Sequence, residues 1–273
     1  MFSIIQEIFE RKNLIYELVL KDIKLRYSRP FLGFLWAFLS PFFTAIIFYL
    51  VFSLFLNIQI KEMPFILYLM SATFPWRFFQ DSITSSTSCL IDNKNLIKEA
   101  RFPYYFIPIS IILANLIIFL PSLPILIIIS LIMLKGLPLF LIFLPLVILI
   151  HLTIITGLAL IFSLLYLKWR DTKYIIEFLL LFLFYLTPVF YSLSLVKTTF
   201  SPFLYSIYIN NPFVGILNLY RCTLLKGFFP LISKEINIFS LIIVPIVFSL
   251  FLFLTGFYLY NKYKNKINEY LFN

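Results

Sequence analysis

The chain has 273 residues and a net charge of +10; 62% of the residues are hydrophobic and only 12% are charged. Soluble domains carry about twice that charged fraction, so the composition excludes an ordinary soluble protein and predicts a multi-pass membrane protein. The lysine and arginine excess, which would suggest nucleic-acid binding in a soluble protein, must then be assessed by its position along the chain.

Residues 1–30 predict an amphipathic helix that lies on the membrane surface. Apolar residues recur there at helical spacing among Glu, Lys and Arg, at Ile4, Ile5, Ile8, Phe9, Ile15, Leu18, Val19 and Ile23. The charges within residues 1–20, from Glu7 to Glu17, argue against a cleavable signal peptide, whose central region is apolar.

Six apolar segments are long enough to cross a bilayer core of about 30 Å, which needs roughly 20 apolar residues per helix. They are residues 31–60, 64–82, 103–134, 137–167, 174–194 and 236–261. Prolines within these segments predict kinks, at Pro108, Pro121, Pro124, Pro145, Pro188 and Pro245. These runs are continuously apolar and longer than the ~10-residue alternating strands of a membrane barrel. The predicted fold class is therefore an all-α membrane protein with six transmembrane helices. Residues 31–263 form its membrane domain and residues 264–273 a cytoplasmic tail.

The positions of lysine and arginine predict the orientation. With six spans, both termini lie on the same side as the links between spans two and three and between spans four and five. That side carries fifteen Lys and Arg residues and the opposite side six. Because cytoplasmic loops carry the excess of positive charge, we expect both termini to be cytoplasmic.

Two links between the spans have a pattern of their own. Residues 91–105, IDNKNLIKEARFPYY, predict a short helix that Asp92 or Asn93 caps and that ends before Pro103. Its charged face suits docking to a cytoplasmic partner, although a plain solvated connector fits the same pattern. Residues 200–209 and 213–225 are apolar but too short to cross, so we expect two short re-entrant helices, with a surface cap as the alternative.

Few groups in the spans suggest chemistry. The six glycines never take the G-x-x-x-x-G-K-[ST] spacing that binds phosphate, so the chain is not expected to hydrolyse ATP itself. His151 is the only histidine and is interpreted as a hydrogen-bonded packing residue, and no metal-ligand spacing surrounds it. Arg77 and Asp81 stand at i, i+4. They form a structural ion pair or face an aqueous vestibule together with the polar run 82–88.

Four sequence blocks, in order along the chain, carry a family resemblance. They are KDIKLRYSRPFLGFLWAFLSP at 21–41, FPWRFF at 74–79 running on to NKNLIKEARFP at 93–103, KWRDTKYIIEFLLLFLFYLTPVFY at 168–191, and NPFVGILNLYRCTLL at 211–225. With these blocks the chain resembles the permease subunits of type-2 ABC transporters that export O-antigen, capsule or teichoic-acid polymers.

The resemblance implies a homodimer in the cytoplasmic (inner) membrane, bound to two copies of a separate ATPase subunit. That partner binds ATP and magnesium, so the chain itself is expected to hold no cofactor, no metal and no catalytic residue. The implied substrate is a lipid-linked polysaccharide, with O-antigen as the first expectation; no nucleic acid is implied. The alternative within the same architecture is a permease for a drug, a lipid or another small amphiphile.

The resemblance also implies four groups of functional residues. The helix that couples to the ATPase contains Asn93, Lys94, Leu96, Ile97, Lys98, Glu99 and Arg101. The phosphate of the carrier lipid would meet Lys24, Arg26 and Arg29, for which ordinary membrane anchoring is an equal explanation. The channel lining would include Tyr49, Phe52, Trp76, Phe79, Tyr185 and Tyr191. The outer gate would include Thr187, Pro188, Asn211, Pro212 and Arg221, although Arg221 fits an interfacial anchor equally well.

Overall fold

The computed structural model describes residues 7, 10–27, 35–57, 60, 63–99, 102–264 and 266–272, with side chains except at 27, 37, 38, 268 and 272. Within these ranges the secondary structure is helical throughout and contains no strand, which confirms the all-α fold class. Arg29 and Arg101, both predicted to be functional, lie outside the described residues.

The described residues of the first half form six helices and one π-helical stretch. They are α2 (Lys12–Tyr27), α3 (Leu35–Phe48), the π-helical Tyr49–Phe55, α4 (Phe65–Asp92), α5 (Lys94–Glu99), α6 (Phe106–Phe119) and α7 (Ser122–Leu134). The second half contains α8 (Leu144–Lys168), α9 (Thr172–Leu186), α10 (Leu193–Thr199), α11 (Pro202–Ile209), α12 (Pro212–Leu224), α13 (Phe228–Ile232), α14 (Val244–Tyr263) and α15 (Ile267–Phe272). A 3₁₀-helical turn at Leu141–Phe143 precedes α8, and a π-helical stretch at Phe239–Ile243 precedes α14.

Three described helical segments are long and apolar enough to cross a membrane: Phe106–Leu134, Leu141–Lys168 and Phe239–Tyr263. They coincide with the predicted third, fourth and sixth spans. The segment Leu39–Phe55 is a shorter apolar helix. The structure therefore supports a membrane-embedded protein, while the six-span count remains a prediction.

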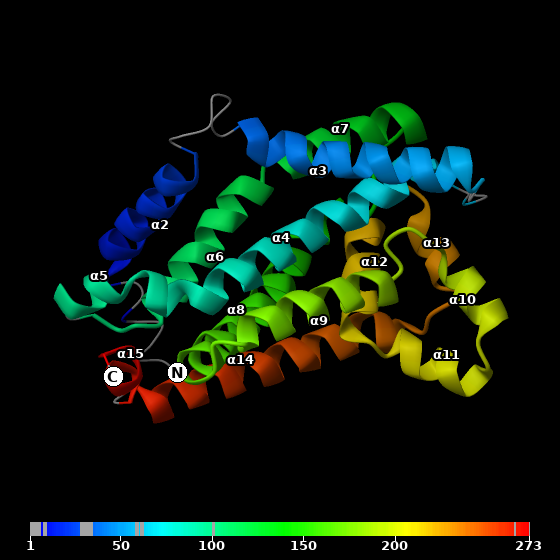
Figure 1. The fold of residues 1–273 in the computed structure, drawn as a ribbon. Helices are drawn as coiled ribbons and strands as arrows, with labels where there is room; N and C mark the ends of the chain where they lie inside the picture. The colour runs from blue at the N-terminus through cyan, green and yellow to red at the C-terminus, as the bar shows by residue number, and fades with distance from the viewer. Residues whose placement is uncertain are drawn as a thin grey trace.

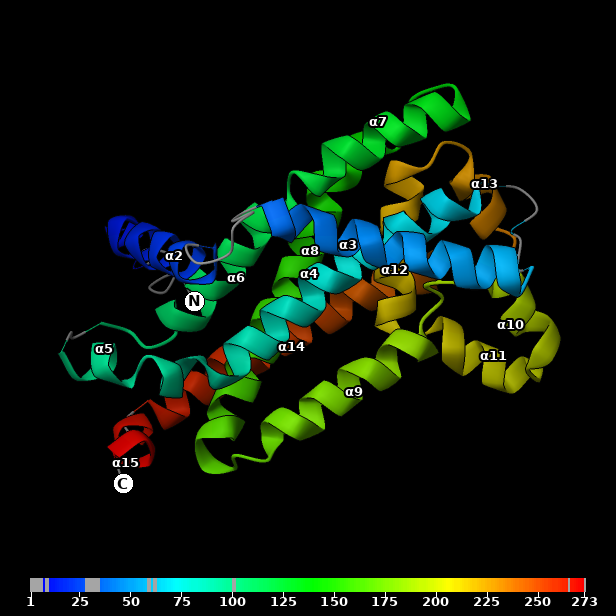
Figure 2. The same cartoon turned by 45° about the horizontal axis from the view of Figure 1, so that its top comes forward.

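The central helix α4 contacts α3, α6, α8, α9 and α12, and in both views it lies between α3 and α9 (Figures 1 and 2). The helix itself does not end with the predicted span at residue 82, because α4 continues to Asp92. Its hydroxyl groups allow the continuation: Thr84 and Thr87 donate to the carbonyls of Gln80 and Ile83, within the same helix. Ser82 and Ser86 are fully buried in the chain, so they do not face an aqueous vestibule.

Two prolines mark breaks in the predicted spans. The third span bends at Leu120 and Pro121, between α6 and α7, as the sequence predicted. The fifth span was predicted to reach residue 194, but α9 ends at Leu186. Thr187 has an extended backbone (ψ 151°), because the residue before a proline avoids the helical conformation. The chain resumes a helix only at α10, which was not predicted.

The helices divide the molecule into two ends. In Figure 1, α2, α5 and α15 lie at one end and α10, α11 and α13 at the other. This arrangement fits the prediction that the first and last segments share a side with the link between spans two and three. Between the fifth and sixth spans, α11 and α12 occur where two short helices were expected, separated at Asn210 and Asn211, and α10 and α13 flank them.

The long helices α8 and α14 pack closely through glycine. A Cβ atom added to Gly157 would lie 2.5 Å from the backbone of Leu252, and one added to Gly256 would lie 2.7 Å from the carbonyl oxygen of Gly157. Only a residue without a side chain permits this approach, so the two glycines allow close packing of the second and third of the three long apolar segments.

Candidate translocation and coupling sites

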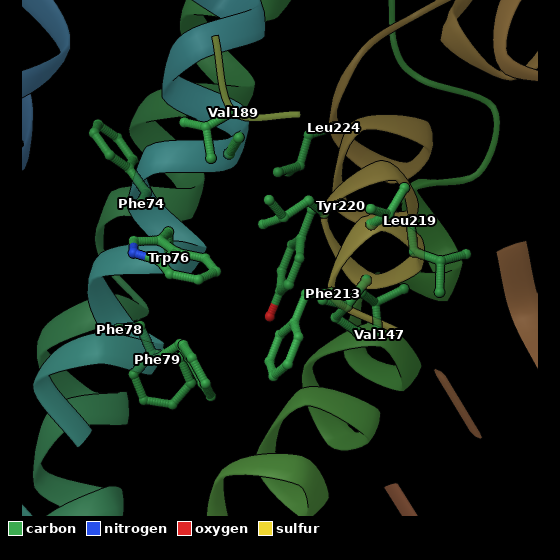
Figure 3. Close-up of a cluster of buried hydrophobic side chains, with 14 of the residues drawn as sticks. Phe74, Trp76, Phe78, Phe79, Val147, Val189, Phe213, Leu219, Tyr220 and Leu224 are labelled. Atoms are coloured by element: carbon green, nitrogen blue, oxygen red, sulfur yellow. The ribbon is translucent and has the colours of Figure 1, made fainter. Parts of the chain in front are cut away.

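Two of the six predicted channel residues, Trp76 and Phe79, belong to the core of the single chain. They are 3% and 1% exposed. The Trp76 ring lies 5.6 Å from the ring of Phe184, and the Phe79 ring lies 5.0 Å from that of Phe213. Figure 3 shows both side chains pointing from α4 toward α12, which carries Phe213 and Tyr220. In this chain both rings join helices; Phe79 is enclosed, and only a small part of Trp76 reaches a cavity.

The other four predicted channel residues gather where the π-helical stretch meets the end of α9. Phe52 stacks on Phe190 with ring centroids 4.5 Å apart. Tyr191 donates from its hydroxyl to the carbonyl of Tyr185 (3.0 Å), and Tyr185 is 54% exposed. The ring of Tyr49 lies 6.5 Å from that of Phe65.

A cavity of about 200 Å³ lies between α3, α4 and α9; we call it the aromatic groove. Its lining includes Thr44, Trp76, Arg77, Gln80, Phe184 and Tyr185. Aromatic rings offer apolar faces, while the amide and hydroxyl groups donate and accept hydrogen bonds. Such a lining suits a molecule with both apolar and hydroxyl surfaces.

Arg221 joins three separate segments at the end that carries α10 to α13. It is fully buried, and its Nη2 donates to the carbonyls of Pro188 and Val189 (3.0 Å for Val189). Its guanidinium lies 3.4 Å from the centre of the Tyr68 ring, and Nη1 donates to Asn218 (3.2 Å). The chain segment after α9 is thereby held against α4 and α12. This burial argues against a lipid-facing anchor.

The predicted gate residues divide into two places. Thr187 and Pro188 lie at the Arg221 junction, where the Thr187 hydroxyl donates to the Phe184 carbonyl (3.1 Å). Asn211 and Pro212 begin α12, and the Asn211 side chain accepts from the Phe213 amide (3.0 Å). The two groups are therefore connected through one helix, with Arg221 in its last turn.

Two tyrosines complete this junction and escaped the sequence analysis. The Tyr68 hydroxyl donates to the Tyr191 carbonyl (2.8 Å), and the hydroxyls of Tyr191 and Tyr208 lie 3.0 Å apart. With 17 tyrosines in the chain, no local pattern distinguishes these positions. Only the proximity of α4, α11 and the segment after α9 identifies them.

The predicted coupling helix exists as α5, next to α2. Ile97 is buried in a cluster with Ile15, Leu18 and Val19 of α2, and Leu96 packs against that cluster. Lys21 of α2 donates to the side chain of Asn93, at the end of α4. Lys94, Lys98 and Glu99 are exposed, so the outward surface of this segment is charged.

The predicted lipid-phosphate residues on α2 have different surroundings. Lys24 is exposed, whereas Arg26 donates to the side-chain oxygen of Asn115 on α6 (2.6 Å). Asp22, on the same helix, is half-buried, and this burial raises the pKa of its carboxyl, against the lowering effect of Lys21 and Arg26.

His151 matches its interpretation as a packing residue. Its Nδ1 lies 3.2 Å from the Tyr220 hydroxyl, and its ring contacts the rings of Phe78 and Phe79. Among the described residues no group of three or more His, Cys, Asp or Glu is arranged to hold a metal ion.

The comparison with known proteins assigns the family. The family described as ABC-2 type transporter matches residues 13–225, most of the chain. The chain belongs to this family. It is also similar to two proteins named O-antigen export system permease protein RfbA. The one from Myxococcus xanthus is 29% identical over 197 residues, 72% of this chain and 75% of that protein. The one from Klebsiella pneumoniae is 28% identical over 252 residues, 92% of each chain.

Proposed function

We propose that this chain is the membrane subunit of an ATP-driven exporter that moves a lipid-linked polysaccharide, O-antigen first, across the cytoplasmic membrane. One observation carries the proposal: the similarity to a permease named for O-antigen export extends over 92% of both chains. A similarity of that extent leaves little of either chain unmatched, so it favours a shared task.

The aromatic groove supports the substrate class. A sugar ring has an apolar face that packs on aromatic rings such as Phe184 and Tyr185, and hydroxyls that bond to Gln80 and Thr44. In the proposed transporter two copies of the chain, each with six spans and both termini in the cytoplasm, form the conduit. The grooves of both copies then contribute to its wall.

The energy comes from a separate ATPase subunit, which binds ATP and magnesium. We assign its docking to the exposed charges of α5, Lys94, Lys98 and Glu99. Because Ile97 packs into the α2 cluster, a displacement of α5 also displaces α2. The bond from Lys21 of α2 to Asn93 transmits it to the C-terminal end of α4. The Arg221 junction at the far end of α4 is the proposed outer gate.

A second function within the family is export of a drug, a lipid or another small amphiphile. The apolar surfaces of α3 and α9 favour it, because large side chains such as Phe43 and Phe178 are exposed there and a mobile amphiphile can follow such a surface. The hydroxyl and amide groups of the aromatic groove favour the polysaccharide.

The test is reconstitution of the full chain with its ATPase in lipid vesicles. We expect ATP turnover to rise when lipid-linked polysaccharide is added, and an amphiphilic drug to have no effect. Charge reversal at Lys98 (Lys98→Glu) should abolish the rise, while Lys262→Glu, on an exposed site of α14, should leave it unchanged. A rise with the drug alone would support the second function, and turnover without the ATPase subunit would contradict the proposal.

A further inference from the structure

A second cavity, of about 230 Å³, lies between α3, α4, α6 and α7. Its lining includes Trp36, Ser40, Arg77, Asp81, Asn115 and Ser122. We call it the Arg77 cavity. Arg77 and Pro41 line both this cavity and the aromatic groove, so the two cavities adjoin. The proposed path of the polymer uses only the aromatic groove.

Charges of both signs face this cavity. Arg77 Nε donates to Asp81 Oδ2 (2.9 Å), and the two side chains are 50% and 41% exposed. Because both side chains stay partly exposed, a ligand can reach the positive and the negative side of the pair. The bond uses Nε, and no other bond of this guanidinium is found among the described residues.

The cavity also contains a buried donor without a partner. Asn115 is 4% exposed, and its Oδ1 accepts from Arg26 (2.6 Å). Its Nδ2 atom is buried and has no hydrogen-bond partner within the described part of the chain. A buried donor is costly when unsatisfied, so an acceptor oxygen from a ligand in the cavity would remove that cost.

The surroundings identify where such a ligand comes from. Exposed apolar side chains flank the cavity on both sides: Phe43 of α3 is 48% exposed, and Ile117 of α6 is 44% exposed. In a membrane-embedded chain these side chains contact acyl chains. The ligand is therefore an amphiphile whose polar head enters the cavity while its tails follow α3 and α6.

We propose that the Arg77 cavity binds the headgroup of a zwitterionic phospholipid. The phosphate oxygens accept from Arg77 and from Asn115 Nδ2, and the ammonium group donates to Asp81. An anionic headgroup satisfies only the donors Arg77 and Asn115. It offers no ammonium group to Asp81 and brings its negative charge close to that carboxylate. The site is a lipid site of the membrane subunit, independent of which molecule is exported.

The test uses the purified full chain and native mass spectrometry, with phosphatidylethanolamine, phosphatidylglycerol and inorganic phosphate as probes. We expect phosphatidylethanolamine to bind best. Arg77→Gln should lower its binding roughly tenfold, the scale of one charge-assisted hydrogen bond, and Arg77→Lys should restore most of it. Asp81→Asn should weaken the binding of phosphatidylethanolamine by a similar factor and strengthen the binding of phosphatidylglycerol. The control Lys197→Gln, which removes a partly exposed ion pair with Glu235 (3.1 Å), should change neither.

The opposite responses of the two lipids to Asp81→Asn decide the case even if Arg77→Gln fails to fold. Preferential binding of phosphatidylglycerol by the unaltered chain would overturn the proposal in favour of an anionic-lipid site. Competition by inorganic phosphate at equal concentration would overturn it in favour of a free-phosphate site. Equal lipid binding by all variants, with unchanged thermal unfolding, would show that no headgroup enters the cavity.

Discussion

The packing of α8 on α14 differs in kind from the packing of α3 and α9. Between α8 and α14 the glycines Gly157 and Gly256 bring two backbones into contact. In contrast, α9 exposes Tyr174 and Phe178 at 72% each, and α3 exposes Phe43 at 48%. The contact between α8 and α14 is complete within the chain, although the outer face of α14 exposes side chains such as Tyr258 (66%). α3 and α9 leave large rings available to a partner, a lipid or a transported molecule.

The Arg221 junction connects these two regions. It holds the segment after α9, which belongs to the open region, against α4 and α12, which belong to the packed one. A guanidinium suits this place because its planar array of donors reaches several carbonyls at once. We therefore expect substitutions in the packed region and at the junction to lower stability, and substitutions in the open region to affect transport alone.

The largest expected effect is that of Arg221→Met. The change leaves the buried Val189 carbonyl unbonded and leaves the Pro188 carbonyl with only a long bond from the Tyr68 hydroxyl (3.5 Å); an unsatisfied buried group costs about 1–3 kcal/mol. We expect the free energy of unfolding in detergent to fall by about 2–4 kcal/mol, with loss of export. Arg170→Met removes an exposed arginine that also lies over a tyrosine ring and should change stability by less than about 0.5 kcal/mol. Equal stability of the two variants would contradict the role of the junction.

A slightly smaller effect is expected for Gly157→Ala. The new methyl group would meet the Leu252 backbone at 2.5 Å, so α8 and α14 must separate, at a cost of about 1–3 kcal/mol. Thermal unfolding of the purified chain measures the loss. Val247→Ile adds the same single carbon to α14 at a position that is 60% exposed, and it should have no measurable effect. A Gly157→Ala chain as stable as the unaltered one would show that the two helices can separate freely.

The sequence predicts the helices better than their contacts. Apolar runs and the prolines that bound them located most of the long helices, and Pro121 correctly marked the bend between α6 and α7. The errors have local causes. Hydroxyl groups bonded back to their own helix carry α4 past its apolar segment, and Thr187 ends α9 early because Pro188 follows it.

The candidate sites were less predictable, because they depend on contacts between distant segments. Arg221 fitted a gate and a lipid anchor equally well on sequence, and only its contacts with Tyr68 and Pro188 show it to be buried. Trp76 was predicted in a family block, but its neighbours come from α9 and α12. Asn115 carries no signal in an apolar run, and its partner Arg26 lies 89 positions away.

A substitution in the open region should reduce transport without changing the stability of the chain. Tyr185 lines the aromatic groove and is 54% exposed, so Tyr185→Ala should alter the free energy of unfolding by less than about 0.5 kcal/mol. We expect export to fall roughly tenfold, the scale of about 1.4 kcal/mol for one aromatic contact. Tyr258→Ala, on α14 at 66% exposure, is the matched control and should export normally. If both variants export alike, the groove is not on the path.

The smallest expected effect concerns the coupling end. Lys21→Gln weakens the hydrogen bond from α2 to Asn93, a partly buried bond that contributes about 0.5–1.5 kcal/mol. The loss should loosen α5 locally, so its amide hydrogens should exchange roughly fivefold faster while global stability is nearly kept. Lys24→Gln alters an exposed lysine of the same helix and should leave that exchange unchanged. Equal exchange in both variants would mean that α2 and α5 respond independently. A signal from the ATPase would then have to reach α4 by a route other than Asn93.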